Sequence, residues 1–414
     1  MEGYKLSVLG GSSANTPELF YSLSSDELEK IGEICLYGRN KKKGEIVKSF
    51  IRGYLKENKI SAKISFSSNL KETISNSKII INQIRVGGLK ARKEDWAVFK
   101  KNNIMCDEAT SPGCMGHSIR GINLFYNIGQ TIKDHNPDAI LVNVTNPCGL
   151  FTDVFTKSGI NAIGSCEIPQ RMVNHIKSRV HLQNIQVDYI GINHLSWILN
   201  VYNKGRNINS DAFRKYEHYF SYTTIKYLNA IPSPYLRYFL NEEQSKKESL
   251  FHEKNRIIEL LKLEQKLLNY YKKAKSFKRP ALLEKRGAVW YKLAIAPLIA
   301  ALLSSKKSLH YVNVRNNNLL SNLSAENSIE VAAWVNDKSI QPIIPKKIPP
   351  EYLAQMVALK EYESLLIDAV LRKSKNLAIN AVTLHPLIHS AETASSLVNF
   401  FWKKEKEYIY SRHN

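Results

Sequence analysis

Short apolar runs alternate with stretches of helical periodicity through the first half of the chain. This alternation of strand and helix is typical of a parallel β-sheet. We also expect a helix near Ile119–Lys133, between two of the runs. The runs that we expect to form strands are LSVL near the start, Glu33–Tyr37, Lys63–Ser67, Lys78–Ile84, Asp138–Val144, Asn161–Ser165 and Val187–Ile192.

The pattern changes after His194. From about residue 204 to residue 278 the chain is charge-dense and mostly helical in period, with apolar positions on one face. An apolar helix over Ala288–Leu303 follows, then strand-like runs at His310–Val314 and Ile329–Trp334, and two closing helices. The chain therefore predicts an α/β domain over residues 1–195 and an α+β domain over residues 196–414.

Composition places the chain among globular proteins. Its 414 residues are 43% hydrophobic, which allows a sizeable core and exceeds what one core usually serves. No apolar run reaches the roughly 18 residues of a membrane span, and the start lacks the features of a signal peptide. We therefore expect a cytoplasmic protein without a membrane segment. Five cysteines, an odd number without scaffold-like spacing, are expected to stay thiols.

The strong positive charge raises the question of an anionic partner. A net charge of +22 and a pI near 9.6 favour encounters with phosphates or nucleic acid. The lysines and arginines are spread along the chain, however, and neither zinc-finger spacing nor an RNP-like motif is present. We interpret the charge as a lysine-rich solvated surface, and nucleic acid is not an expected partner.

The first strand leads into a turn of small residues and then a helix start. Thr16 is expected to be the N-cap of that helix, and a proline and an acidic residue follow it in the first turn. Exposed N–H groups at such a turn favour an anion, yet the dinucleotide-binding glycine pattern is degenerate here. The turn residues are therefore interpreted either as part of a dinucleotide site or as a plain strand-helix turn. They are Gly10, Gly11, Ser12 and Ser13.

Two arginines follow expected strands. Arg39 comes where an acidic residue would bind the ribose of NAD, and it faces either solvent or the 2′-phosphate of NADP. Arg85 and Val86 precede paired glycines, which let the backbone approach a ligand, and the guanidinium fork of Arg85 suits phosphate.

Reactive side chains follow three further runs. Asn146 comes after one, Cys166 and Glu167 after the next, and Asn193 and His194 after the third. Ligands bind outside the carboxyl ends of strands in open α/β sheets, so a thiol, a carboxylate and an imidazole are expected to converge on one crevice. For Cys166 alone, a buried thiol is the simpler interpretation.

Two tyrosines in the sequence PSPYLRY complete the set of candidate residues. Tyr235 and Tyr238 are three positions apart and share a face if this segment is helical. Packed aromatic side chains are the alternative interpretation.

Taken together, these motifs resemble the family 4 glycoside hydrolases, the NAD-dependent 6-phospho-glycosidases, galactosidases and uronidases. The resemblance implies a Rossmann-type, NAD-binding domain related to lactate and malate dehydrogenases, a family-specific α+β domain, and a homodimer or homotetramer. The matching segments are GGSSANTPEL, QIRVGG, the Glu108 loop, NVTNPCGLFTD, GSCEIP, GINH, PYLRY, EKRG, HYVNVRNNN and LHPL.

The resemblance also implies a reaction. Family members do not hydrolyse glycosides with a carboxylate pair. Bound NAD+ oxidises the sugar at C3, a protein base removes the C2 proton, the leaving group is eliminated, water adds, and hydride returns. An anionic, phosphorylated sugar is the expected substrate.

Residue roles are carried over position by position. Cys166 and His194 match the ligands of a divalent metal, Mn2+ or another, which acts as a Lewis acid. Tyr235 matches the C2 base, with Tyr238 as the alternate. Glu167, where relatives carry Asp or Asn, is either the leaving-group acid or a sugar contact.

The remaining matches concern binding. Arg85, Asn146, Asn193 and Arg286 match substrate-binding positions. Gly10, Gly11, Ser12, Ser13, Arg39, Val86, Glu108 and Asn143 are the expected cofactor-binding residues.

Some residues depart from the family pattern and indicate a divergent member that acts on an unusual glycoside. Cys148 stands where alanine is commoner, Cys106-Asp107 replaces Gly-Gln, and the ribose acid is missing. One alternative is an NAD(P)-dependent oxidoreductase of sugars or hydroxy acids that cleaves no glycoside. The other is a non-catalytic or nucleic-acid-binding descendant.

Overall fold

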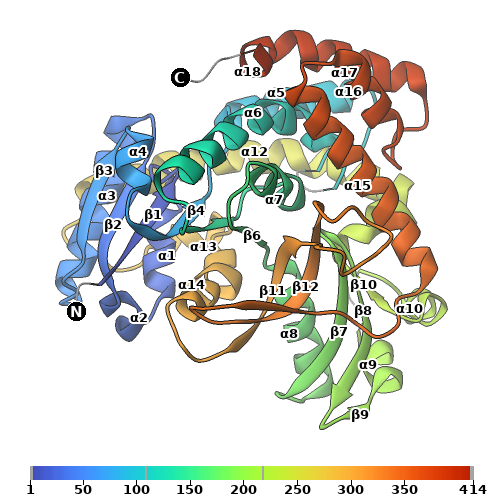
Figure 1. Ribbon diagram of the computed structural model, residues 1–414, viewed down its shortest axis with the longest axis horizontal. Coiled ribbons are helices and arrows are strands. Elements are labelled where there is room, and N and C mark those ends of the chain that lie inside the picture. Colours follow the sequence, from blue (N-terminus) through green and yellow to red (C-terminus); the bar gives the residue numbers. More distant parts are fainter. Residues whose placement is uncertain (1–2, 108–109, 217–218, 411–414) are drawn as a thin grey trace.

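The computed structural model describes residues 3–107, 110–216 and 219–410, whose strands form one 13-stranded sheet (Figure 1). Six neighbouring strands are parallel, in the order β3-β2-β1-β4-β5-β6. This is the strand order of a Rossmann fold. These strands are β1 (Tyr4–Leu9), β2 (Ile31–Tyr37), β3 (Lys63–Ser67), β4 (Ser77–Asn82), β5 (Ile140–Asn143) and β6 (Ala162–Ser165).

The sheet continues beyond β6 with antiparallel strands. β11 pairs with β6, and β12, β7, β8 and β10 follow in that order. They are β7 (Ile185–Ile192), β8 (Leu195–Asn203), β10 (Ile231–Pro232), β11 (Ser308–Arg315) and β12 (Ser328–Val335), with β9 (Arg206–Asn207) on β8 and β13 (Ile340–Ile343) on β12.

The expected α/β class with a Rossmann-type parallel sheet is confirmed. The division at residue 195 stays a prediction, because the sheet runs through both halves.

One strand departs from the reasoning that led to the site. β7 reaches β6 through β12 and β11, each pairing antiparallel, and therefore runs opposite to β6. The rule for carboxyl ends of parallel strands does not apply to β7.

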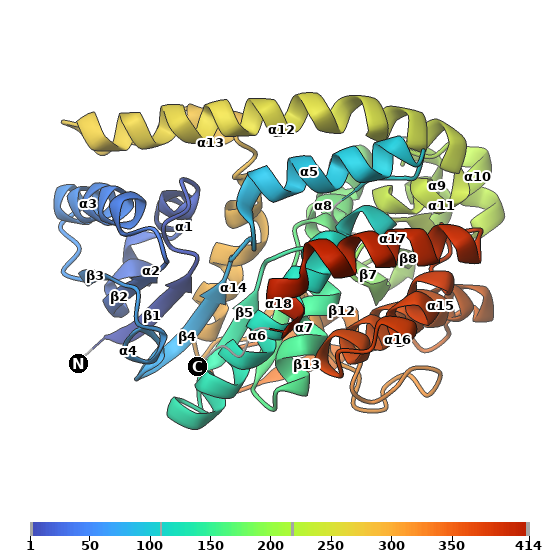
Figure 2. The same ribbon diagram turned by 90° about the horizontal axis from the view of Figure 1, so that it is seen from above.

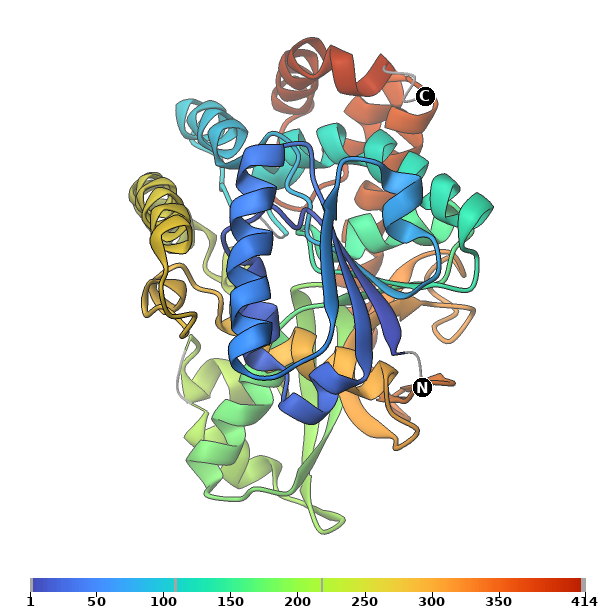
Figure 3. The ribbon, with the colours of Figure 1, turned by 90° about the vertical axis from the view of Figure 1, so that its left-hand side faces the viewer.

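Helices cover both faces of the parallel strands. Figure 3 shows α3 on one side of β1 to β3 and α6 on the other. The first helices are α1 (Thr16–Ser22), α2 (Ser25–Glu29), α3 (Lys41–Glu57), α4 (Leu70–Ile74), α5 (Gly88–Lys101), α6 (Met115–His135), α7 (Cys148–Lys157) and α8 (Ile168–Val180). The later ones are α9 (Asn209–Lys215), α10 (Tyr222–Leu228), α11 (Arg237–Leu240), α12 (Glu242–Lys273), α13 (Leu282–Lys285), α14 (Ala296–Leu302), α15 (Pro350–Leu371), α16 (Lys375–Thr383), α17 (Ala391–Lys404) and α18 (Lys406–Tyr410).

The long helix α12 ties the second half of the chain to the first. Figure 2 shows it along one side of the molecule, beside α3 and α5. Glu264 of α12 accepts a 2.5 Å bond from Lys43 of α3, and the ring of Tyr271 stacks on Phe50 with centroids 4.3 Å apart. The charge-dense helical stretch thus packs against the parallel-sheet half. Within the described residues, no helix combines the length and apolar character needed to cross a membrane.

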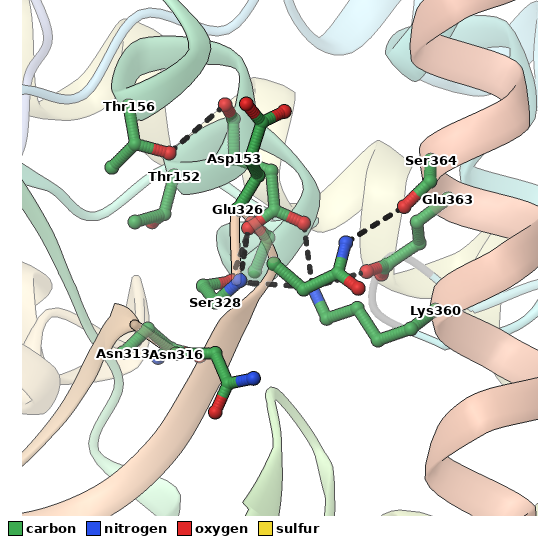
Figure 4. Close-up of polar contacts among 12 residues, drawn as sticks. Thr152, Asp153, Thr156, Asn313, Asn316, Glu326, Ser328, Lys360, Glu363 and Ser364 are labelled. Atoms are coloured by element: carbon green, nitrogen blue, oxygen red, sulfur yellow. Dashed lines mark hydrogen bonds and ion pairs between the residues drawn. The ribbon is translucent and has the colours of Figure 1, made fainter. Parts of the chain in front are cut away.

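A buried ion cluster fastens α15 to α7 and β12 (Figure 4). The Lys360 ammonium lies 2.8 Å from a carboxylate oxygen of Asp153 and 2.7 Å from one of Glu363. It also donates to Ser328 Oγ at 3.2 Å. Its side chain is 0% exposed, so the carboxylates take the place of the water that an ammonium ion needs.

Candidate functional site

The turn after β1 is pressed against β2. The N–H groups of Gly10 and Gly11 donate to the Tyr37 carbonyl oxygen at 3.0 and 2.8 Å. A Cβ on Gly11 would lie 2.7 Å from the Leu36 Cβ, so this approach requires glycine. Both amides are already bonded, as is the Ser13 N–H, which donates to the Gly10 carbonyl oxygen at 3.0 Å, so the hydroxyls of Ser12 and Ser13, which line the cavity beside Gly10, are the candidates for phosphate contact.

Helix α1 starts one residue earlier than expected. Asn15 occupies the N-cap position, Thr16 is already helical, and Pro17 stands in the first turn. The expected early acidic residue, Glu18, is buried and binds Arg279 at 2.8 Å.

The loop after β4 is fastened from α6. The N–H of Val86 donates to His117 Nε2 at 3.2 Å, and its carbonyl oxygen accepts from Arg120 Nε at 3.4 Å. Arg85 and Val86 both line the same cavity as the turn after β1. Two hydrogen bonds to α6 thus fix the backbone next to Arg85.

One cavity of about 1370 Å³ connects these elements with the end of β6. Arg39 lines one part of it, and Asn146, Cys166 and Glu167 line another. Its volume exceeds the roughly 300–1,000 Å³ of a typical single-ligand pocket. There is therefore room for a dinucleotide together with a small substrate.

Arginines gather in this cavity. Burial lowers the pKa of Arg286, and the nearby Arg85, Arg256 and Arg92 lower it further, whereas Glu264 opposes the change. All four arginines line the cavity. Among the described residues, the buried Nε of Arg286 has no hydrogen-bond partner. Several guanidinium ions close together, one of them with an N–H donor that has no acceptor, favour an anionic ligand.

Cys166 and His194 meet at the edge of this cavity. The Cys166 Sγ lies 3.1 Å from the His194 Nε2, and His194 adopts a φ of 69° in the turn between β7 and β8. Burial lowers the pKa of His194 to about 3, so its ring is neutral, and burial raises the pKa of the Cys166 thiol. A sulfur and a neutral ring nitrogen this close together could both coordinate the same metal ion.

Tyr235 covers the imidazole. Its ring stacks on His194, with centroids 4.1 Å apart and an interplanar angle of 27°. Ser233 joins the two segments, because its hydroxyl donates to the His194 carbonyl oxygen at 2.6 Å and accepts from the Tyr235 N–H at 3.3 Å. The Tyr238 hydroxyl instead donates to Asp107 at 3.1 Å. Burial raises the pKa of both phenols.

The two tyrosines do not share one regular helix. Pro234–Leu236 forms a 3-10 turn, and the short helix α11 begins at Arg237. Their rings nevertheless meet edge to face, with centroids 5.7 Å apart.

Glu167 stands beside the thiol. One carboxylate oxygen lies 3.6 Å from Cys166 Sγ, and the other lies 4.0 Å from Arg171, one helical turn later. The side chain is 27% exposed, so it reaches the cavity without being sealed from water.

Asn193 is held by a buried carboxylate. Its amide donates to Glu330 at 3.1 Å, as does that of Asn313, while the Tyr189 hydroxyl donates to the other oxygen at 2.5 Å. Burial raises the pKa of Glu330. Three side chains, one from each of three strands, thus fix the residue before His194.

Asn143 does not line the cavity. Its amide donates to the Cys148 carbonyl oxygen at 3.1 Å and its oxygen accepts from Asn82 at 3.0 Å, which shapes the loop before α7. Glu108 lies outside the described residues. The functional roles of all the candidate residues stay predictions.

Several residues of the site were not among the sequence candidates. Ser233 lies within a quoted motif, PSPYLRY, but a serine between two prolines suggests only a turn. Glu330 stands inside an apolar run, and a lone charge in such a run was the available signal. Arg92 and Arg256 lie in charge-rich helices, where nothing distinguishes them from solvated arginines.

Comparison with known proteins identifies relatives across nearly the whole chain. The family described as "Family 4 glycosyl hydrolase" matches residues 5–182, and its C-terminal domain matches residues 189–388. The 6-phospho-beta-glucosidase BglT of Thermotoga maritima is 30% identical, over 98% of this chain and 99% of that protein. A probable 6-phospho-beta-glucosidase of Bacillus subtilis is 25% identical, over 99% and 98%.

Solved structures agree. The Thermotoga maritima 6-phospho-beta-glucosidase with manganese, NAD+ and glucose-6-phosphate superimposes with a TM-score of 0.88 at 30% identity, covering 98% of this chain and 99% of that one. Malate dehydrogenase from Plasmodium falciparum gives a TM-score of 0.54 at 14% identity, over 88% and 98%. The second likeness concerns the fold alone.

Proposed function

The chain belongs to family 4 of the glycosyl hydrolases, and we propose that it cleaves 6-phospho-glucosides with the help of NAD and a divalent metal ion. The observation that carries this proposal is the single cavity in which the turn after β1, the arginine cluster and Cys166 all take part. Nucleotide, sugar phosphate and reacting carbons therefore have one place in which to meet.

The arginine cluster supports a phosphorylated substrate. Arg85 and Arg286 each offer a planar fork that matches two phosphate oxygens. A phosphate dianion would relieve the mutual repulsion that lowers the pKa of Arg286, and would fill its unpaired Nε. An uncharged glucoside would leave that repulsion in place.

The donor pair at the reacting end fits a divalent cation, Mn2+ or another. Cys166 and His194, whose Sγ and Nε2 atoms lie 3.1 Å apart, would be the protein's ligands, and the sugar's oxygens would complete the coordination sphere. A neutral imidazole is the form that binds metal, and a cation nearby reverses the rise in a thiol's pKa. When bound, the ion polarises the sugar's oxygens, and NAD exchanges a hydride with the sugar.

Proton transfer falls to this chain's side chains. We assign removal of the proton at the sugar's C2 to Tyr235, which stacks on His194 and whose raised pKa a bound metal ion would lower, and Tyr238, which donates to Asp107, stays the alternate. Glu167, whose carboxylate lies 3.6 Å from Cys166 Sγ, would give a proton to the leaving oxygen or contact the sugar. Asn193, held by Glu330, would contact the sugar beside His194.

Cofactor choice is expected to depend on Arg39. The carboxylates among the described lining residues are Glu167, near the reacting end, and Glu264, which binds Lys43. The end of β2 thus offers a cation where NAD-specific sites place an acid, so use of NADP alongside NAD is part of the proposal.

The test follows nitrophenol release from α- and β-nitrophenyl glucosides with and without a 6-phosphate, adding NAD+, Mn2+ and reductant singly and together. We expect release only from 6-phosphates, with cofactor and metal both present, loss on adding EDTA, and no build-up of NADH. NADH accumulation without nitrophenol would overturn the proposal in favour of the oxidoreductase.

Assembly and location belong to the same proposal. We expect a homodimer or homotetramer in the cytoplasm, as the family resemblance implies. Light scattering of the purified protein measures the number of copies, and a monomer would contradict this expectation.

A further inference from the structure

The side chain of Gln83, just after β4, holds both ends of the turn after β1. Its amide nitrogen donates to the Gly10 carbonyl oxygen at 3.1 Å and to the Thr16 hydroxyl at 2.8 Å. Gly10 begins this turn and Thr16 is the first residue of α1. Between them lie Ser12 and Ser13, whose hydroxyls are the candidates for phosphate contact. The position of Gln83 therefore determines the shape of the turn that we assign to the dinucleotide.

Tyr291, from the second half of the chain, holds the other side of the Gln83 amide. Its hydroxyl donates to the Gln83 Oε1 atom. Burial raises the pKa of Tyr291, so the phenol keeps its proton and acts as the donor. The Gly10 carbonyl oxygen can only accept, so one orientation of the Gln83 amide satisfies both neighbours. These residues form a chain of hydrogen bonds from the C-terminal half to the turn after β1.

The segment that leads to Tyr291 also carries Arg286. Two N–H groups of Arg256, on α12, donate to the Lys285 carbonyl oxygen at 3.2 Å, and Gly287 has a φ of 81°. Arg286 lies between these two fixed points, and its buried Nε has no partner among the described residues. Tyr291 then begins a π-helical stretch, a feature that is frequent at functional sites. One short segment thus carries a phosphate-binding candidate and the residue that holds Gln83.

An anion at Arg286 would act on this whole segment. Burial and three neighbouring arginines lower the pKa of Arg286, which means that its charge is disfavoured without a counterion. A bound phosphate would compensate that charge and pair the Nε, and so fix the segment up to Tyr291. A fixed Tyr291 holds Gln83, and Gln83 holds the turn after β1. Two anionic ligands in one cavity repel each other, so a tightening of both has to come from contacts of this kind.

We propose that Gln83 and Tyr291 are positioning residues that couple the sugar-phosphate site to the dinucleotide site, so that each ligand raises the affinity for the other. This inference rests on the proposed function and adds a dependence between its two ligands. The factor is the same in both directions, because binding free energies are linked. A reaction that takes a hydride from the sugar and returns it requires the dinucleotide to stay bound while the sugar is present, and this coupling favours that.

Calorimetric titration of NAD+ into the protein with Mn2+, in the absence and presence of saturating glucose 6-phosphate, measures the coupling. We expect the sugar phosphate to lower the Kd for NAD+ at least about fivefold. Tyr291→Phe should reduce this factor about 2- to 10-fold, the worth of one hydrogen bond. Tyr270→Phe is the matched control and should keep the full factor, because Tyr270 lies on α12, is 38% exposed and does not line the cavity.

Gln83→Met breaks the same chain of hydrogen bonds while Tyr291 stays intact, and it should reduce the factor as well. Combining it with Tyr291→Phe should reduce the factor no further, because both changes act through one chain. An equal factor in the unchanged protein and in both single variants would overturn the coupling, as would a Kd for NAD+ that glucose 6-phosphate does not lower. Either result would leave the proposed function standing. Failure of NAD+ or glucose 6-phosphate to bind the unchanged protein would refute the proposed function together with the coupling.

Discussion

Replacing Lys360 by methionine should destabilise the protein strongly, because two carboxylates would stay buried without their cation. Asp153 and Glu363 are each within 2.8 Å of the Lys360 ammonium. Burial already raises the pKa of both carboxyls, and Lys360 is the group that opposes this rise. Methionine fills a similar volume, so packing changes little while the charge is lost.

The size of the effect follows from the cost of protonation. The ordinary pKa values of Asp153 and Glu363 are 3.8 and 4.5, so at pH 7 keeping either carboxyl neutral costs about 1.4 kcal/mol for each of two to three pH units. Relaxation reduces the sum, and we expect a loss of about 3–5 kcal/mol. A carboxyl whose pKa is higher in the folded than in the unfolded chain stabilises the fold at pH values below its unfolded pKa. This stabilisation is lost as the pH rises from the unfolded pKa through the folded pKa. The deficit should therefore shrink to about 1–2 kcal/mol at pH 5.

Urea unfolding at both pH values measures this difference. Lys247→Met is the matched control, since Lys247 pairs with Glu243 on an exposed helix face and should change stability little. Lys360→Met combined with Asp153→Asn and Glu363→Gln removes all three charges and should recover much of the loss. A deficit below about 1 kcal/mol that is the same at pH 5 and pH 7 would refute the reasoning.

Three further predictions concern the site. Arg286→Gln should raise KM for a 6-phospho-glucoside about 10- to 100-fold, the worth of a charge-assisted hydrogen bond, and equal effects on unphosphorylated glucosides would argue against a phosphate contact. Arg39→Asp should lower NADP use relative to NAD at least about tenfold, as titrations of both nucleotides would measure; an unchanged ratio would place Arg39 in solvent. Tyr235→Phe should abolish exchange of the C2 hydrogen with deuterated water, whereas Tyr238→Phe should preserve it, and the opposite result would exchange their roles.

Local pattern was sufficient for several strands of the parallel sheet. Asn161–Ser165 differs from β6 by one residue, because a strand buried on both faces is a short apolar run bounded by polar residues. Lys63–Ser67 coincides with β3, the edge strand, whose apolar and polar residues alternate. The apolar helix expected over Ala288–Leu303 is less regular. It contains a π-helical stretch at Tyr291–Ile295 before α14 begins, and hydrophobic periodicity does not report such a change of hydrogen bonding.

The meeting of Cys166 with His194 was expected for a reason that holds for only one of them. Cys166 follows a parallel strand, as the rule requires, but His194 follows β7, which runs the other way. What places the imidazole is the turn between β7 and β8, and Ser233, from a segment 39 residues later, holds the backbone of that turn through the His194 carbonyl oxygen. Pairings of that kind depend on the order of strands in the sheet, which no local pattern contains.

Glu330 is a second residue whose contacts local sequence could not predict, here because of the energetic cost of a buried charge. A carboxylate within an apolar strand is costly unless it is satisfied. Its partners Asn313, Tyr189 and Asn193 come from β11, from β7 and from the turn after β7, and they become neighbours only because β12 lies between β7 and β11. The charge that looked like an irregularity in a strand therefore holds the Asn193 side chain in the turn that carries His194. Buried polar residues of this kind are the ones whose function emerges only once the sheet order is known.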